Sequence, residues 1–152
     1  MEISEIAIAD GLNISDFLQP ISAEHPAGVS LKETASYAEI QEARASDDPS
    51  LPMGVWEREL KRSDWGRVSK LTQAILLEKS KDLQVAIWFA EAQVHLHGIV
   101  KLPACILLLA ELTNTFWDDI HPLMDGGDVE YRTNLFAWMN DKFPMVIRQV
   151  TL

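Results

Sequence analysis

The segment from Ser80 to Gly98, SKDLQVAIWFAEAQVHLHG, is apolar on nearly every side when it is drawn as a helix. Only a narrow edge is polar, and it consists of Gln84, Glu91, Gln93 and His95. A helix of this kind is normally enclosed by other helices. Ser80 can cap its start by accepting a hydrogen bond from a free backbone N–H, and Gly98 can adopt the left-handed conformation that closes its end. We therefore predict a central buried helix against which the rest of the chain packs.

Apolar residues recur at helical spacing in four further stretches. They run from Leu31 to Ala45, from Asp64 to Leu76, from Leu102 to Trp117, and onward from Asp128, which we expect to cap the last helix. The helix after Gly98 should begin near Leu102, because Pro103 is tolerated only in a first turn. The short connection through Gly98 predicts that this helix runs antiparallel to the central one. Pro144 should end or kink the last helix.

No stretch shows the alternating, β-branched pattern of a strand. The predicted fold is therefore all-α: a compact helical domain of about five to seven helices around a central antiparallel buried hairpin, with an irregular N-terminal strap. Residues 1–20 should form a tail with one short helical turn near Ser15–Leu18, capped by Asn13 or Ser15. Residues 21–152 should form a single helical domain, because 152 residues is an ordinary size for one core. Residues 46–63 should form an irregular loop, since prolines interrupt the pattern there.

The formal net charge of −10 excludes some classes of partner. A chain with this charge repels nucleic acid phosphates and anionic lipid, so we expect neither as a partner. The N-terminus lacks the basic and long apolar regions of a secretory signal, and no apolar run approaches the ~20 residues that span a bilayer. Cys105 is the only cysteine, which fits a reducing compartment. These features predict a cytoplasmic location without membrane insertion.

The charge is uneven along the chain. Between residues 58 and 81 there are seven basic and only three acidic side chains. Such a run is usually a solvated helix face, but it also suits a protein partner. Trp56 falls in the predicted loop and could anchor such a contact. The candidate docking residues are Trp56, Lys61, Arg62, Arg67 and Lys70.

The candidates for metal or thiol chemistry are weak. His95 and His97 are two residues apart, so on a helix they point away from each other, and the pair Glu91 and His95 lacks a third ligand. Histidines in a last turn interact favourably with the helix dipole. Cys105 lies in an apolar run, where a thiol is inert, so pairing with His121 as a base is disfavoured. We predict no catalytic residue, no metal site and no cofactor.

The aromatic residues are expected mainly in the core. Trp65 and Trp88 fall on inward positions of their helices, and the inward stripe of the last helix is Tyr131, Leu135, Trp138 and Met139. A second stripe on the last helix could be exposed and mediate self-association. It consists of Phe136, Phe143, Val146 and Ile147.

The order of several short motifs resembles a known family. These are ISAEHPAGVSL from Ile21, YAEIQEAR, SDWGRVSKL, LLEKSKDLQVAIWFAEAQVHLHG, LLLAELTNTFWDDIHPL and finally YRTNLFAWMN, which ends at Asn140. Together they resemble the ImpA-type N-terminal domain of TssA proteins, components of bacterial type VI secretion systems. The residues that carry the resemblance are Ser80, Lys81, Asp82, Leu83, Gly98, Trp117, His121, Pro122, Arg132 and Trp138.

The resemblance implies a non-enzymatic domain that binds protein subunits of the baseplate, tail tube or sheath while the secretion machine is assembled. It implies a cytoplasmic location at the membrane-docked machinery, and a domain that is part of a longer multidomain protein. The alternative within the family is an accessory subunit that caps or terminates the sheath. A small metal- or thiol-dependent enzyme is the alternative from another class.

Overall fold

The computed structural model describes residues 5–9, 11–46, 62–123 and 130–150, and its fold is all-α apart from one short hairpin. The strands are β1 (Ala7–Ala9) and β2 (Leu12–Asn13). The helices are α1 (Ile14–Phe17), α2 (Ala35–Arg44), α3 (Trp65–Glu78), α4 (Leu83–His97), α5 (Leu102–Thr115) and α6 (Glu130–Val150), with a 3₁₀ turn, η3 (Ile99–Lys101), before α5. The predicted fold class is confirmed.

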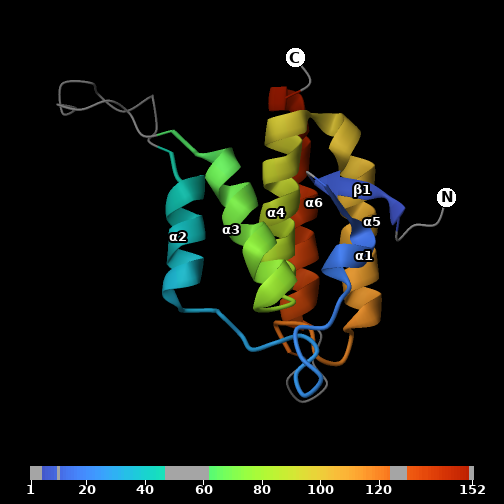
Figure 1. The fold of residues 1–152 in the computed structure, drawn as a ribbon. Coiled ribbons are helices and arrows are strands. Elements are labelled where there is room, and N and C mark those ends of the chain that lie inside the picture. Colours follow the sequence, from blue (N-terminus) through green and yellow to red (C-terminus); the bar gives the residue numbers. More distant parts are fainter. Residues whose placement is uncertain (1–4, 10, 47–61, 124–129, 151–152) are drawn as a thin grey trace.

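Helix α4 is the centre of the fold, as its sequence predicts. It contacts α3, α5 and α6, while α2 packs on the outer side of α3 (Figure 1). The side chains from Leu83 to Val94 are buried, with Gln84 as the one half-buried exception. Helices α4 and α5 run antiparallel and are joined at one end of the bundle by Gly98 and η3. The surrounding helices satisfy the need of an apolar helix for contacts on every side.

The ends of the helices follow from local capping. Asp64 accepts a hydrogen bond from the backbone N–H of Arg67 at 3.0 Å and so begins α3. Helix α4 begins differently from the prediction, because its N-cap is Asp82 and not Ser80. Gly98 ends α4 with φ of 85° and ψ of −174°. This is a region that only glycine adopts readily, but it is not the left-handed helical conformation that we expected.

The N-terminal strap contains the structure that the sequence analysis missed. Strands β1 and β2 pair antiparallel, and Asn13 then caps α1 in a reciprocal arrangement with Asp16. The expectation that no strand is present is therefore wrong here. The strand was missed because only Ile6 and Ile8 alternate with polar or small residues, and so short a run is not recognisable as a strand. Ile8, Ile14 and Phe17 are fully buried, so the strap contributes to the core.

Two helix boundaries also differ from the prediction. Helix α2 begins at Ala35 instead of Leu31, because a turn closed by the N–H of Thr34 and the carbonyl of Leu31 precedes it. Helix α6 continues through Pro144 to Val150. Residues Asn140 and Pro144 are both exposed, so this part of the helix faces water, which can bond to the Asn140 carbonyl that loses its backbone N–H partner. The predicted cap Asp128 lies outside the described residues.

The inward face of α6 is rotated from the predicted one. Tyr131 is 59% exposed, whereas Phe143 and Val146 are buried. Leu135, Trp138 and Met139 pack against the core as expected. The stripe proposed for self-association is therefore wrong, because two of its four residues are buried within the domain itself.

Gly28 brings the strap into close contact with the segment between α3 and α4. It has φ of 70° and pairs with Ser80 in an isolated antiparallel bridge. A Cβ atom at Gly28 would lie 2.1 Å from the carbonyl oxygen of Lys79. Neither the backbone conformation nor the available space allows a side chain here.

We predict that Gly28→Ala destabilises the fold much more than Gly11→Ala. Gly11 has nearly the same φ, 71°, but a Cβ there would meet no atom within 4 Å. Gly11→Ala should lower the free energy of unfolding by about 1–2 kcal/mol, the cost of positive φ alone. Gly28→Ala should lower it by at least about 2 kcal/mol more, because backbone must move. Urea denaturation of both variants measures this, and equal losses would contradict the close packing of Gly28.

Candidate functional site

Lys81 is completely buried, although the sequence places it in a basic run expected to be solvated. Its Nζ donates hydrogen bonds to the carbonyl oxygens of Phe17 at 2.7 Å and Leu76 at 2.6 Å, and it lies 5.5 Å from the centre of the Phe116 ring. Burial lowers the pKa of Lys81 to about 8. The prediction that Lys81 is solvated is wrong, because its amine is bound by the carbonyl of Leu76, at the end of α3, and by that of the distant Phe17.

Asp82 joins α2 to the start of α4. Its carboxylate accepts hydrogen bonds from the backbone N–H of Val85, at 3.2 Å, and from the hydroxyl of Tyr37. Burial raises the pKa of Asp82, and the hydrogen bonds from Tyr37 and the backbone oppose that shift. Burial and the neighbouring carboxylate also raise the pKa of Tyr37 well above its ordinary value. The carboxylate therefore acts as a helix cap and as an anchor for α2.

His121 fastens the connector after α5 to the beginning of α4. Its backbone N–H donates to the carbonyl of Lys81 at 3.0 Å, and its own carbonyl accepts from the N–H of Leu83 at 2.8 Å. The ring Nε2 lies 3.0 Å from the carbonyl oxygen of Gly28. Because a carbonyl can only accept, Nε2 carries the proton. His121 is thus engaged with Gly28 and not with Cys105.

Arg132, at the start of α6, holds the same connector from the other side. It is 2% exposed, and its guanidinium donates to the carbonyls of Trp117 at 2.6 Å, Ile120 at 2.7 Å and Pro122 at 2.8 Å. It also lies 4.8 Å from the centre of the Trp117 ring. We call Tyr37, Lys81, Asp82, His121 and Arg132 the polar junction. In this junction every side chain has a structural partner.

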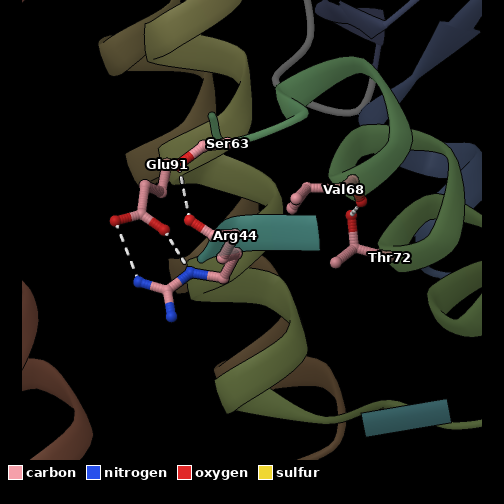
Figure 2. Close-up of polar contacts among 5 residues, drawn as sticks. All are labelled: Arg44, Ser63, Val68, Thr72 and Glu91. Carbon is pink, nitrogen blue, oxygen red and sulfur yellow. Dashed lines mark hydrogen bonds and ion pairs between the residues drawn. The ribbon is translucent and has the colours of Figure 1, made fainter. Parts of the chain in front are cut away.

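A second buried contact clamps α2 to α4. Arg44 Nε lies 2.6 Å from Glu91 Oε1, and the guanidinium is 5.4 Å from the Trp88 ring and 5.5 Å from the Trp138 ring. Figure 2 shows the two side chains facing each other, with Ser63 donating to the carbonyl of Arg44 at 2.5 Å. In the same view the hydroxyl of Thr72 donates a hydrogen bond of 2.7 Å to the carbonyl of Val68, one turn earlier in α3. Glu91 is therefore used as an ion-pair partner.

The other candidate reactive residues are also occupied or buried. The His95 ring stacks on Trp65 with ring centres 4.0 Å apart, and burial lowers the pKa of His95 despite the nearby Glu91. Burial raises the pKa of Cys105 to about 12, so its thiol is poorly reactive at neutral pH. Within the described ranges, no group of three or more His, Cys, Asp or Glu residues is placed to hold a metal ion.

The predicted docking residues lie on or before α3. Arg62, Arg67 and Lys70 are exposed, while Trp56 and Lys61 lie outside the described residues. Arg67 is not a free cation, because it lies 2.7 Å from Glu42 and 3.9 Å from Glu39, both on α2. The exposed face formed by α2 and α3 therefore carries both signs of charge.

Sequence reasoning missed several residues that shape these sites. Tyr37, Arg44 and Ser69 become important through partners on α4, and Ser69 accepts a hydrogen bond from the buried Gln93 at 2.7 Å. The available signal was the presence of Glu91 and Gln93 on a helix that is otherwise apolar. Polar groups inside such a helix require buried partners, although the sequence does not say which.

The fold and these sites define an α-helical domain whose buried polar groups serve its own architecture. A family model described as "ImpA, N-terminal, type VI secretion system" matches residues 18–141. The chain belongs to this family, as the sequence resemblance indicated. None of the helices in the described part of the chain is long and apolar enough to cross a membrane.

Two relatives support the assignment. The type VI secretion system component TssA1 of Pseudomonas aeruginosa is 32% identical over 117 residues, which cover 77% of this chain and 33% of TssA1. A solved N-terminal domain of the TssA component from Burkholderia cenocepacia, including the conserved ImpA_N region, superposes with a TM-score of 0.76 and 31% identity. That match covers 97% of this chain and 52% of the solved one. The chain thus spans about a third to a half of the length of these relatives.

We predict that Arg44 and Glu91 are strongly coupled in stability. Arg44→Leu should lower the free energy of unfolding by about 2 kcal/mol or more, since it leaves the Glu91 carboxylate buried without its cation. The double variant Arg44→Leu with Glu91→Leu should be more stable than Arg44→Leu alone. Urea denaturation of the four proteins of the cycle tests this. Additive losses would show that the pair does not interact.

We predict a pH dependence of stability that belongs to Lys81. The pKa of Lys81 is about 8 in the folded chain and 10.5 ordinarily, so between these values the unfolded chain binds more protons. Stability conferred by Lys81 must therefore rise as the pH increases through this window. Relative to Lys81→Met, the wild type should gain about 2 kcal/mol between pH 7.5 and pH 9.5.

Urea denaturation of both proteins at the two pH values gives this difference. Tyr37 and Cys105 titrate in both proteins, so their contributions to the pH dependence cancel when the two free energies of unfolding are subtracted. A difference that stays constant would show that Lys81 ionises normally in the folded chain.

Proposed function

We propose that this domain is a non-enzymatic interaction module of a TssA-like component. It binds protein subunits of the baseplate, tail tube or sheath in the cytoplasm while the type VI secretion machine is assembled. The observation that carries the proposal is the family match over residues 18–141, together with 32% identity to TssA1.

The structure supports this proposal through the use of its polar groups. The polar junction and the pair of Arg44 and Glu91 are engaged in internal contacts. The titratable groups that suggested chemistry, His95, Cys105 and His121, are stacked, buried or bonded to backbone. A domain whose buried polar groups stabilise its own fold is suited to presenting a rigid surface to a partner.

We propose the exposed face of α3 as one docking surface. It contains Arg62, Arg67 and Lys70, and Trp56 and Lys61 are assigned to it from the sequence alone. Arg62 and Lys70 are the better anchors, because the charge of Arg67 is balanced by Glu42 and Glu39. Charges at the rim of an interface mainly steer association and set its specificity.

We predict that Arg62→Glu with Lys70→Glu weakens binding to purified baseplate, tube or sheath subunits by about tenfold. The matched control is Lys32→Glu with Lys142→Glu, which makes the same change in net charge at two exposed positions away from α3. Titration calorimetry at two salt concentrations measures both variants. Equal weakening by the two variants would show that only net charge matters. If the wild type bound none of the subunits, the proposed function would be refuted.

A further inference from the structure

A groove lies between α5 and α6 on the side of the bundle away from α2. Both helices pack on α4 and contact it more extensively than they contact each other. The groove has a volume of about 410 Å³, and its walls include Ile106, Ala110 and Trp117 from the α5 side and Phe136 and Met139 from α6. Ile106 is 50% exposed and Trp117 is 41% exposed. Two large apolar side chains thus line the groove and remain partly accessible to solvent.

Arg132 supports the end of the groove where Trp117 lies. Its guanidinium lies 4.8 Å from the centre of the Trp117 ring and donates to the Trp117 carbonyl at 2.6 Å. Because Arg132 is itself buried and bonded to two further carbonyls, it braces the Trp117 backbone and contacts one face of the ring. A preorganised aromatic side chain is the kind of residue on which binding energy concentrates.

The composition of the groove restricts the partner. Within the part of the chain that the structure describes, its lining residues are all uncharged, whereas 24% of the whole chain is charged. The centres of protein interfaces are depleted of charge and enriched in aromatic residues and methionine. A charged side chain entering this groove would lose its hydration without gaining an ion pair. The surface that enters must therefore be apolar.

The shape of the groove argues against a dimer whose two-fold axis passes through it. Such a dimer would place groove against groove and leave the hollow unfilled. Atoms lining such a void lose their dispersion contacts. A single helix is convex and can lie between two others at the usual interaxial distance of about 8–10 Å.

The charges beyond the groove set the direction of that helix. Exposed Asp118 follows Trp117 at one end, whereas Lys101 precedes α5 and exposed Arg148 lies in the last turn of α6. Since α5 and α6 run in opposite directions, both cations lie toward the other end of the bundle (Figure 1). The positive N-terminus of an inserted helix is most stable beside Asp118.

We infer that this groove binds one amphipathic helix of another secretion subunit. That helix presents an apolar stripe, carries lysine or arginine in its first turns, and runs in the same direction as α6. The inference rests on the proposed function, because it specifies where one of the assembly partners binds.

We predict that Ala110→Arg weakens binding of the full chain to the cognate purified baseplate, tube or sheath subunit by about tenfold or more. Ala110 is exposed in the wall of the groove, so arginine can extend into it without disturbing the core. The matched control is Ala38→Arg, an exposed alanine on α2, which should change the Kd by less than about twofold. Binding is measured by calorimetry, and circular dichroism confirms helicity. Asn114→Arg, at an exposed groove position, replaces Ala110→Arg if that variant loses helicity.

The outcomes separate this inference from the proposed function. If wild type and Ala110→Arg bind a subunit equally, the groove is not the site, while the function stands. If the wild type binds no subunit, both fail. If light scattering shows dimers that Ala110→Arg converts to monomers, a second copy fills the groove and the inference is wrong. A photo-crosslinker at Ala110 should label the apolar face of a helix with a basic first turn, and labelling of any other surface overturns the inference.

Discussion

The fold depends on one buried amine that is bound by backbone carbonyls from two separate segments. Lys81 bonds to the carbonyl of Phe17 at the end of α1 and to that of Leu76 in the last turn of α3. Lysine can do this because its flexible stem carries a compact group with several donors, and a neutral amine still has two N–H groups for two carbonyls. The N-terminal strap, the end of α3 and the start of α4 are thereby fixed to one another.

The rest of the polar junction follows from this fixed point. Once Lys81 is extended and buried, Asp82 is placed to cap α4 and to accept the hydroxyl of Tyr37, which positions α2. His121 then pairs with the same segment, and Arg132 closes the connector that leads to α6. Residues that could serve as acid, base or metal ligand are used to join helices. This use of buried polar groups explains why their presence does not imply chemistry in this domain.

Features that depend on residues close in the sequence could be predicted, whereas features that depend on residues far apart in the sequence could not. Helices α3 and α5 were predicted because apolar periodicity is a local property of the sequence. The choice between Ser80 and Asp82 as the cap of α4 was wrong, since either fits the local rule. It is decided by Ala27 and Gly28, which hold residues 80 and 81 in an extended conformation from more than fifty positions away. The burial of Lys81 could not be predicted for the same reason, because its acceptors are main-chain atoms without a sequence signature.

The central helix, which the sequence predicts most clearly, also explains where the domain is open. Helix α4 is apolar all round and takes α3, α5 and α6 as neighbours. On one side α2 covers this first layer, packing on α3 and reaching α4 through Tyr37 and Arg44. On the other side the N-terminal strap, with β1 and α1, packs on α5, while Ile106 and Trp117 remain exposed at the groove between α5 and α6. A helix supplied by another subunit at this groove would extend the second layer by the same packing rules.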